Sequence, residues 1–191
     1  MLIPILAVLL QAQAPEARLV RYPHVHQNHV AFTYLGDIWT ATTEGNDLRR
    51  LTVHTARDAY PRFSPDGKWI AISSDRYGNL DVFVIPVEGG QPTRLTYHSA
   101  GDLVLGWTPD GTRVLFSSNR NERFGAMLYT VNLTGGMPVS AGPDIGVYAS
   151  YSPDGGKLAF NRKSQVYWRK GYRGSNQSDV TVLTVASGTF T

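Results

Sequence analysis

The tetrapeptide SPDG at residues 64–67 returns as TPDG at 108–111 and as SPDG at 152–155, so successive copies lie 44 residues apart. Proline restricts φ, aspartate bonds to nearby backbone and glycine accepts a positive φ, so each copy favours a tight turn between strands. Three kinds of segment repeat in the same register: the apolar runs 70–72, 114–116 and 158–160, the SSDR and SSNR segments 73–76 and 117–120, and the RLT segments 50–52 and 94–96. Several independent features in one register predict a repeat architecture.

Each repeat reads as four short strands. The runs WIAI at 69–72 and VFVI at 82–85 are apolar without alternation, whereas a strand with one face in water alternates. We therefore expect neighbouring sheets to cover both faces of these strands. Gly89-Gly90 supplies the next turn, and 93–96 is expected to be a short outer strand. Four short strands in a unit of this length, each sheet packed between neighbours, predict the blade of a β-propeller.

The chain contains four such repeats, the first of which lacks the Pro-Asp-Gly turn. The register predicts blades at about 18–59, 60–102, 103–147 and an incomplete fourth at 148–191. The predicted fold is all-β, with three complete four-stranded blades and a partial fourth. Because propellers close with roughly four to eight blades, we expect an open arc of a larger propeller of about six or seven blades. We interpret the chain as an amino-terminal fragment; the alternative is a closed four-bladed propeller.

The composition excludes several other classes of protein. The 191 residues are 42% hydrophobic and 17% charged, which is too apolar for a disordered chain. No cysteine is present, which excludes disulfide scaffolds and thiolate zinc sites. The net charge is only +3, so composition gives little support for binding of nucleic acid.

The amino terminus is predicted to be a leader. Residues 2–10 read LIPILAVLL, which is shorter than the roughly 20 apolar residues of a membrane-spanning helix. Ala12-Gln13-Ala14 then matches the small-residue cleavage pattern of a secretory signal peptide, although no Lys or Arg precedes the apolar run. We therefore predict a signal peptide over 1–14 and an exported protein, periplasmic or in the cell envelope. The alternative is an apolar leader that stays attached, and no other segment predicts a membrane span.

The fourth repeat carries an insertion between its second and third strands. Residues 162–174 hold five basic and three aromatic side chains and no acid. Such a cluster suits single-stranded nucleic acid, a loop packed by its own aromatic rings, or a loop that contacts another domain or a peptide carboxylate. With so small a net charge we predict no nucleic-acid partner. The candidate peptide or inter-domain contacts are Arg169, Lys170, Tyr172 and Arg173.

The segment WRKGYRG at 168–174 resembles an element in the first propeller of the tricorn protease family. The opening of the chain is also similar to that family, with Tyr22-Pro23, then VAF at 30–32 and GDIW at 36–39. The repeats resemble the TolB-type propeller repeat, whose SPDG, SSDR, GG-x-P and RLT elements all occur between 64 and 96. The resemblance covers roughly residues 20–191.

This resemblance implies a function for the parent protein. Tricorn proteases are large serine peptidases that trim oligopeptides, with two propellers, a PDZ domain and a later catalytic region. The propellers filter and channel peptides, so the implied partners are peptide substrates, the protein's own downstream domains and further copies of the chain in a homo-oligomer. The catalytic serine lies in that later region, so the resemblance places no catalytic residue here. The archetype is cytoplasmic, which is the alternative location. Its arginine pair that anchors a peptide carboxylate has no counterpart at 97–102.

Two other functions stay open. The chain could be a TolB-type binding propeller of the cell envelope without an attached enzyme, or the propeller of a prolyl-oligopeptidase-type peptidase. No G-x-S-x-G elbow occurs, and none of the histidines stands in a catalytic signature: His24, His26, His29, His54 and His98. The spacing His24-x-His26-x-x-His29 has no acid or cysteine nearby, so we predict no metal and no cofactor. The repeated aspartates Asp66, Asp110 and Asp154 are expected to serve the turns.

Overall fold

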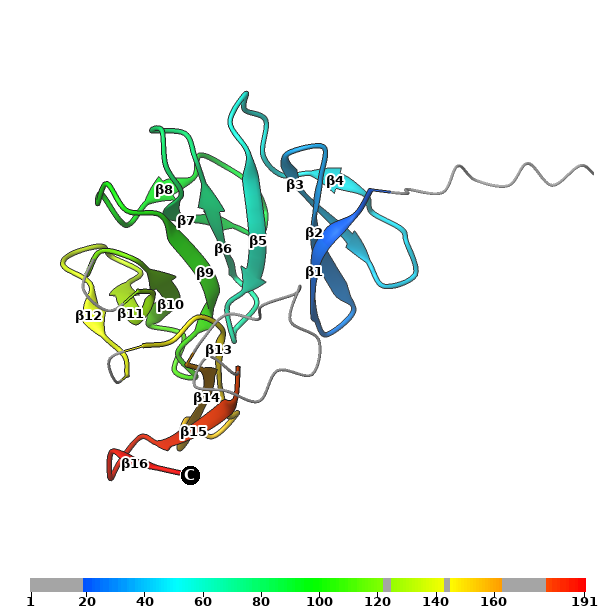
Figure 1. Cartoon of the computed structure of the whole chain (residues 1–191). Coiled ribbons are helices and arrows are strands. Elements are labelled where there is room, and N and C mark those ends of the chain that lie inside the picture. The colour runs from blue at the N-terminus through cyan, green and yellow to red at the C-terminus, as the bar shows by residue number, and fades with distance from the viewer. Residues whose placement is uncertain (1–18, 122–124, 143–144, 163–177) are drawn as a thin grey trace, which may run out of the picture.

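The computed structural model describes residues 19–121, 125–142, 145–162 and 178–191, so the predicted leader lies outside the described residues. Within these ranges the chain forms sixteen strands in four antiparallel sheets of four strands each. The sheets are the blades of a propeller and lie side by side in an arc (Figure 1). Nothing in the described ranges is a helix long and apolar enough to cross a membrane. The predicted all-β propeller fold is confirmed.

Each blade is a meander in which successive strands pair. Blade 1 consists of β1 (Arg21–His26), β2 (His29–Tyr34), β3 (Asp37–Thr42) and β4 (Arg49–Arg50), and blade 2 of β5 (Asp58–Phe63), β6 (Trp69–Ser74), β7 (Asp81–Pro86) and β8 (Thr93–Arg94). Blade 3 consists of β9 (Asp102–Trp107), β10 (Arg113–Ser118), β11 (Met127–Asn132) and β12 (Val139–Ser140), and blade 4 of β13 (Ala149–Tyr151), β14 (Lys157–Asn161), β15 (Val180–Thr184) and β16 (Thr189–Phe190).

The outer strand of the fourth blade is short. β16 pairs with β15 through Leu183 opposite Phe190. The outer strand of every blade is only two residues long, so a short tail is enough to form one. The outer strand of blade 2 is equally short: only Thr93–Arg94 of the segment around RLT is a strand, and the next residue, Leu95, is buried in the core.

The core lies between neighbouring blades. One buried cluster joins blades 1 and 2 around Ile38 and Phe63, a second joins blades 2 and 3 around Val82 and Phe116, and a third joins blades 3 and 4 around Leu158. Burial follows this layering. Five of the six residues in each of β6, β7 and β10 are buried, whereas β2 and β14 of the outermost blades alternate. The continuous apolar runs therefore mark strands that are covered on both faces, as predicted.

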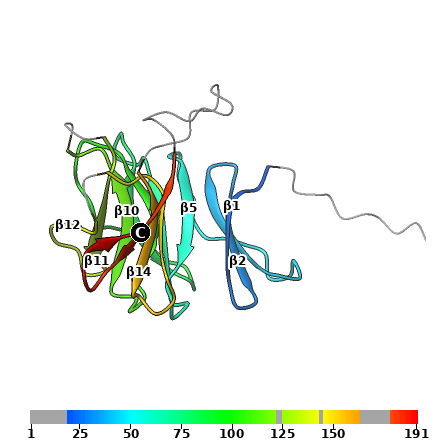
Figure 2. The same ribbon diagram turned by 60° about the horizontal axis from the view of Figure 1, so that its bottom comes forward.

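The connections gather at two ends of the arc, and the strands run between them (Figure 2). We call the end with the SPDG turns the turn end, and the end with the loops 51–57, 75–80 and 95–101 the long-loop end. At the turn end each blade packs against the next one. Gly111 lies against Pro65 and Gly155 against Pro109, so an added Cβ would meet those rings at 3.6 and 3.2 Å. In blade 1, which lacks the proline, the His26 ring occupies the corresponding place against Gly67.

A candidate binding surface at the long-loop end

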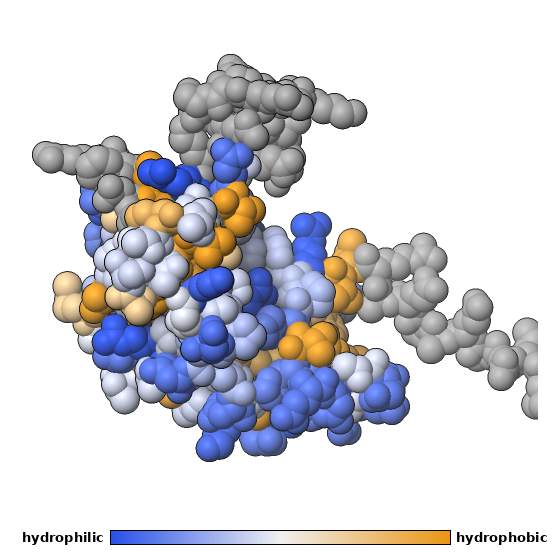
Figure 3. Space-filling model, turned by 90° about the horizontal axis from the view of Figure 1, so that it is seen from below, coloured by the Kyte–Doolittle hydropathy of each residue, from blue (hydrophilic) through white to orange (hydrophobic). Residues whose placement is uncertain are grey.

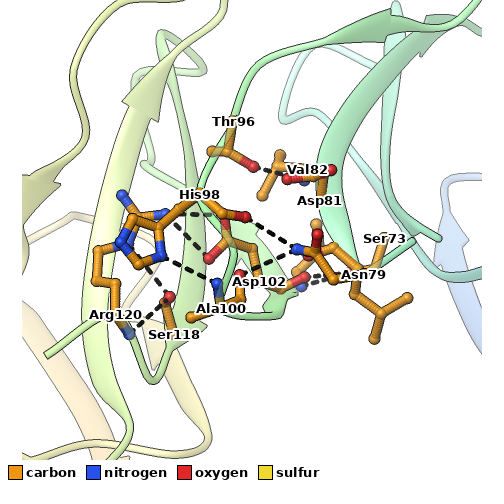
Figure 4. Close-up of polar contacts among 12 residues, drawn as sticks. Ser73, Asn79, Asp81, Val82, Thr96, His98, Ala100, Asp102, Ser118 and Arg120 are labelled. Atoms are coloured by element: carbon orange, nitrogen blue, oxygen red, sulfur yellow. Dashed lines mark hydrogen bonds and ion pairs between the residues drawn. The ribbon is translucent and has the colours of Figure 1, made fainter. Parts of the chain in front are cut away.

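The long-loop end is held by buried ion pairs that repeat with the blades. Asp58 and Asp102 are the first residues of β5 and β9, and both are fully buried. Arg76 lies 2.7 Å from the Asp58 carboxylate, and Arg120 reaches both oxygens of Asp102 at 2.9 and 2.8 Å (Figure 4). The arginines come from the SSDR and SSNR segments, so this repeat positions a guanidinium above the innermost strand of its own blade.

The RLT segments make a second set of contacts at the same end. In blade 2, Arg94 lies 2.6 Å from Asp81, the first residue of β7, and the Thr96 hydroxyl accepts a hydrogen bond from the Val82 N–H at 2.9 Å (Figure 4). Burial raises the pKa of Asp81, and the charge of Arg94 opposes that effect. In blade 1, Arg50 pairs with Asp37, which repeats the Arg94–Asp81 contact. Each residue of the RLT motif therefore has its own structural task.

Blade 3 lacks the Arg–Asp contact of the RLT segment, because both residues of that pair have changed, and blade 4 lacks the buried aspartate that begins β5 and β9. Met127 begins β11 where Asp81 begins β7, and Val139–Ser140 replaces the arginine of β8. Before β13, the N–H of Gly146 bonds to Ala126 as that of Asp102 bonds to Leu80. Gly146 thus stands in the position of the buried aspartate, and Leu128 of blade 3 fills the space beside it.

The innermost strands line the axis of the arc. These are β1, β5, β9 and β13, which neighbour one another in that order (Figure 1). Side chains link them directly: the Trp107 indole donates to the Arg62 carbonyl at 2.9 Å, and the Arg62 guanidinium donates to the Leu105 carbonyl at 3.0 Å. The Phe63 N–H donates to His24 Nδ1 at 3.1 Å, so that nitrogen is unprotonated. Burial, followed by the charge of Arg62, lowers the pKa of His24 to about 4.

Two tyrosines on these strands adopt unusual backbone conformations. Tyr22 of β1 and Tyr60 of β5 have φ values of 53° and 56°, each at a register shift in its strand pair. Their rings lie 4.0 Å apart between centroids. A bulky residue in the left-handed region is strained by about 1–2 kcal/mol. Such strain, held by surrounding structure, is typical of functional sites.

The phenol groups of this pair are perturbed in opposite directions. Burial, and then a hydrogen bond to Tyr22, raises the pKa of Tyr60 to about 12. The pKa of Tyr22 is lowered, chiefly by that hydrogen bond and then by the positive charges of Arg57 and Arg21. Tyr60 is also within electrostatic range of Tyr148, which precedes β13. Phenols from blades 1 and 2 thus meet on the inner strands at this end.

The residues singled out from the sequence are distributed differently. Arg169, Lys170, Tyr172 and Arg173 lie outside the described residues. The histidines do not form one cluster: His24 and His26 both lie beside the Phe63 ring, and His29 is exposed. His54 and His98 each accept a hydrogen bond at Nδ1 from the backbone two residues later. Across the described ranges, no three His, Cys, Asp or Glu side chains are grouped so that they could hold a metal ion.

The aspartates of the SPDG turns have the role expected from the sequence. Asp66 accepts hydrogen bonds from the Ser64 hydroxyl at 2.6 Å and from the Lys68 N–H at 3.1 Å. These two bonds are the main reason that the pKa of Asp66 is lowered. Asp110 and Asp154 make the same pair of contacts in their own turns.

Sequence reasoning did not find the buried ion pairs or the tyrosine pair. The ion pairs leave a signal, because Asp58 and Asp102 repeat in step with Arg76 and Arg120. The tyrosines leave none, because their left-handed backbone depends on bulges in the pairing of the inner strands.

The comparisons with known proteins agree with this architecture. The family model of the tricorn protease N-terminal beta propeller domain matches residues 17–191. This range extends well beyond the three turns, which lie within residues 64–155. Tricorn protease homolog 1 of Streptomyces coelicolor is 39% identical over 67 residues, which cover 35% of this chain and 6% of that protein. The chain therefore corresponds to a small part of its curated relatives.

Solved structures show the same fold. The crystal structure of the tricorn protease matches with a TM-score of 0.73 and 25% identity, over 91% of this chain and 18% of that one. The structure of a putative TolB from Agrobacterium tumefaciens matches with a TM-score of 0.68 and 20% identity, over 86% of this chain and 60% of that one. At 20% identity the TolB match shows the fold alone. The match to the family model spans all four blades, and residues 17–191 of the chain therefore belong to the tricorn protease family, within its N-terminal β-propeller domain.

Proposed function

We propose that this chain is the N-terminal propeller segment of a serine-type peptidase that degrades oligopeptides, and that it channels peptides along the propeller axis toward a catalytic domain elsewhere in the protein. The observation that carries the proposal is the family match combined with the pairing of Tyr22 and Tyr60 on the inner strands. Tyrosine rings offer apolar contact to side chains and a hydroxyl to peptide backbone, which suits sequence-tolerant contact with extended peptides.

The rigidity of the long-loop end supports a channel rather than a deformable surface. Arg76, Arg94 and Arg120 are tied to buried carboxylates, so the loops that carry them are fixed relative to the inner strands. A fixed rim can select peptides by size and charge, because it does not adapt to each ligand. The proposed partners are accordingly peptides, the downstream domains of the same protein and further copies of it.

The test uses the protein that carries this segment in its source organism. We expect it to hydrolyse oligopeptides and to lose that activity with a serine-directed covalent reagent. Tyr60→Ala is expected to change KM for peptides of about ten residues, and to leave hydrolysis of a short fluorogenic peptide unchanged. Tyr97→Ala is the matched control, because Tyr97 is 73% exposed and lies on the loop after β8, away from the inner strands. Equal effects of Tyr60→Ala on both substrates, or no peptidase activity, would contradict the proposal.

A TolB-type binding propeller is the second candidate, and the TolB structural match supports it. On this alternative the protein would lack peptidase activity and would be recovered from the cell envelope in complex with another protein. Export of the protein, which the predicted leader implies, is part of either proposal. A fusion of residues 1–30 to a reporter that is active only in the periplasm tests the export directly. Reporter activity supports export, and an inactive reporter contradicts it.

A further inference from the structure

A cavity between blades 1 and 2 opens at the long-loop end, beside Tyr22 of the tyrosine pair. Its volume is about 350 Å³, within the range of small-ligand sites. Its walls include Leu19, Arg21, Tyr22, Thr33, Leu35 and Arg57. They come from β1, from β2, and from the loops that precede β1, β3 and β5.

The cavity is cationic. Arg21 and Arg57 both line it, and the wall contains no carboxylate. Neither arginine is in an ion pair with any residue that the structure describes, in contrast to Arg76 and Arg120. The guanidinium groups also act on Tyr22, since their charges contribute to its lowered pKa. Two cations without a built-in counter-ion favour the binding of an anion, because a guanidinium fits carboxylate and phosphate oxygens with paired hydrogen bonds.

Thr33 supplies a second, independent indication. It lines the cavity and is only 5% exposed, and its hydroxyl has no hydrogen-bond partner among the described residues. The buried hydroxyl of Thr52, by contrast, accepts a hydrogen bond from the Ile38 N–H at 2.9 Å. A buried hydroxyl without a partner is unfavourable unless a bound group completes it. Thr33 is therefore placed to donate a hydrogen bond into the cavity.

The remaining wall is apolar. Leu19 and Leu35 both line the cavity and are 57% and 72% exposed, so they present apolar surface beside the two arginines. They offer contact to an aliphatic group attached to the anion. The cavity thus presents a charged floor, a hydroxyl and two leucine side chains.

We propose that this cavity binds a small oxyanion that carries a short aliphatic group, with Arg21 and Arg57 holding the oxyanion, Thr33 donating to it, and Leu19 and Leu35 contacting the aliphatic part. The oxyanion is either the carboxylate of an amino acid or peptide end, or a phosphate ester. Tyr22 lines this cavity and also belongs to the tyrosine pair, so the site adjoins the proposed peptide channel, but anion binding is measured without any peptidase activity.

The test is a titration of the 191-residue chain by calorimetry with three probes: N-acetylleucine, isobutyl phosphate and the neutral N-acetylleucinamide. We expect at least one anion to bind at least tenfold more tightly than the amide, which corresponds to one charge-assisted contact of about 1.4 kcal/mol. Tighter binding of N-acetylleucine identifies a carboxylate site, and tighter binding of isobutyl phosphate identifies a phosphate site. Equal binding of all three probes, or of none, overturns the proposal.

Substitutions of the lining residues test whether the anion binds in this cavity. Arg21→Gln and Arg57→Gln are each expected to weaken the anion about tenfold, whereas Arg49→Gln is not, because Arg49 is an exposed arginine of β4 outside this cavity. Thr33→Val is expected to weaken the anion while the melting temperature stays the same or rises, because the hydroxyl it removes has no structural partner. A drop in melting temperature with unchanged affinity would assign Thr33 a purely structural role and overturn its part in the site.

Discussion

The guanidinium of Arg120 donates to both oxygens of the Asp102 carboxylate, at 2.9 and 2.8 Å, and that carboxylate is completely buried. The ring of Phe116 lies 5.1 Å from the same guanidinium, so the cation is also packed against an aromatic face. Arg76 repeats the arrangement with Asp58 and Phe83 one blade earlier. A buried pair of this kind fixes geometry more than it adds net stability, because both charges have been taken out of water.

Breaking that pair from one side is expected to be severe. Arg120→Ala leaves the Asp102 carboxylate buried and unpaired, so we expect a loss of about 3–5 kcal/mol in the free energy of unfolding, measured by urea denaturation. Arg49→Ala is the control, since its contact with Glu88 is a 3.8 Å pair between exposed side chains. We expect that change to be within about 0.5 kcal/mol. Similar losses for both variants would show that the Asp102 pair is no more important than a surface contact.

Thr96 is expected to be needed for its hydroxyl and not for its shape. Thr96→Val removes the acceptor of the Val82 N–H, which is buried at the start of β7, and should lower stability by about 1–3 kcal/mol. Thr40→Val is the matched control, because the buried Thr40 hydroxyl has no hydrogen-bond partner within the described ranges. Urea denaturation of both variants is the measurement. A Thr40→Val loss as large as that of Thr96→Val would contradict the assignment.

Gly146 is expected to be required for space. An added Cβ would lie 2.6 Å from Leu128 Cγ, and Leu128 is buried in the cluster between blades 3 and 4. Gly146→Ala should therefore cost about 1–3 kcal/mol through overpacking. Gly106→Ala, where nothing lies within 4 Å, should be nearly neutral in the same thermal melts. Leu128→Ala leaves a cavity of its own, so the double variant should lose less than the sum of the two single losses, and strictly additive losses would rule out the contact.

Acid is expected to weaken the contact between blades 1 and 2 through His24. The pKa of His24 is lowered to about 4 in the folded chain, whereas an unfolded histidine titrates near 6.5. Between those values the unfolded chain binds more protons, so stability is full above about pH 6.5 and falls as the pH drops through the window. The groups that face His24 are Arg62 and His26, and protonation also removes the acceptor of the Phe63 N–H.

We expect a loss of about 1–2 kcal/mol between pH 7 and pH 4.5, because His24 is partly exposed and solvent screens the effect. Denaturation at both pH values is the measurement. His24→Gln should flatten the dependence, and His29→Gln should leave it intact, since His29 is exposed. A wild-type stability that does not change over this range would count against the buried neutral histidine.

Blade 4 carries apolar side chains that are exposed to solvent. Figure 3 views the molecule from the side of that blade, where several apolar residues lie close together and others are scattered among hydrophilic ones. Val180 and Phe190 of blade 4 are 70% and 50% exposed. The isolated chain is therefore expected to self-associate at high concentration, which sedimentation velocity would detect as a concentration-dependent shift. A monomer at all concentrations would show that these side chains are too dispersed to drive association.

The repeats by themselves determined the architecture of this protein. SPDG at 64–67 and its copies specify turns whatever surrounds them, because Pro, Asp and Gly act on their own local backbone. The continuous apolar runs of β6 and β7 specify strands covered on both faces, since an exposed face would not tolerate them. These are local effects, and a local effect can be read from a few adjacent residues.

The tertiary structure decided what those blades bring together. Arg120 and Asp102 are 18 residues apart and meet only when the second and third strands of blade 3 fold over its first. The left-handed backbone of Tyr22 and Tyr60 arises from bulges in strand pairing, and the cavity lined by Arg21, Thr33 and Arg57 exists only between two packed blades. Such sites depend on register and on the spacing of neighbouring sheets, which no short stretch of sequence encodes.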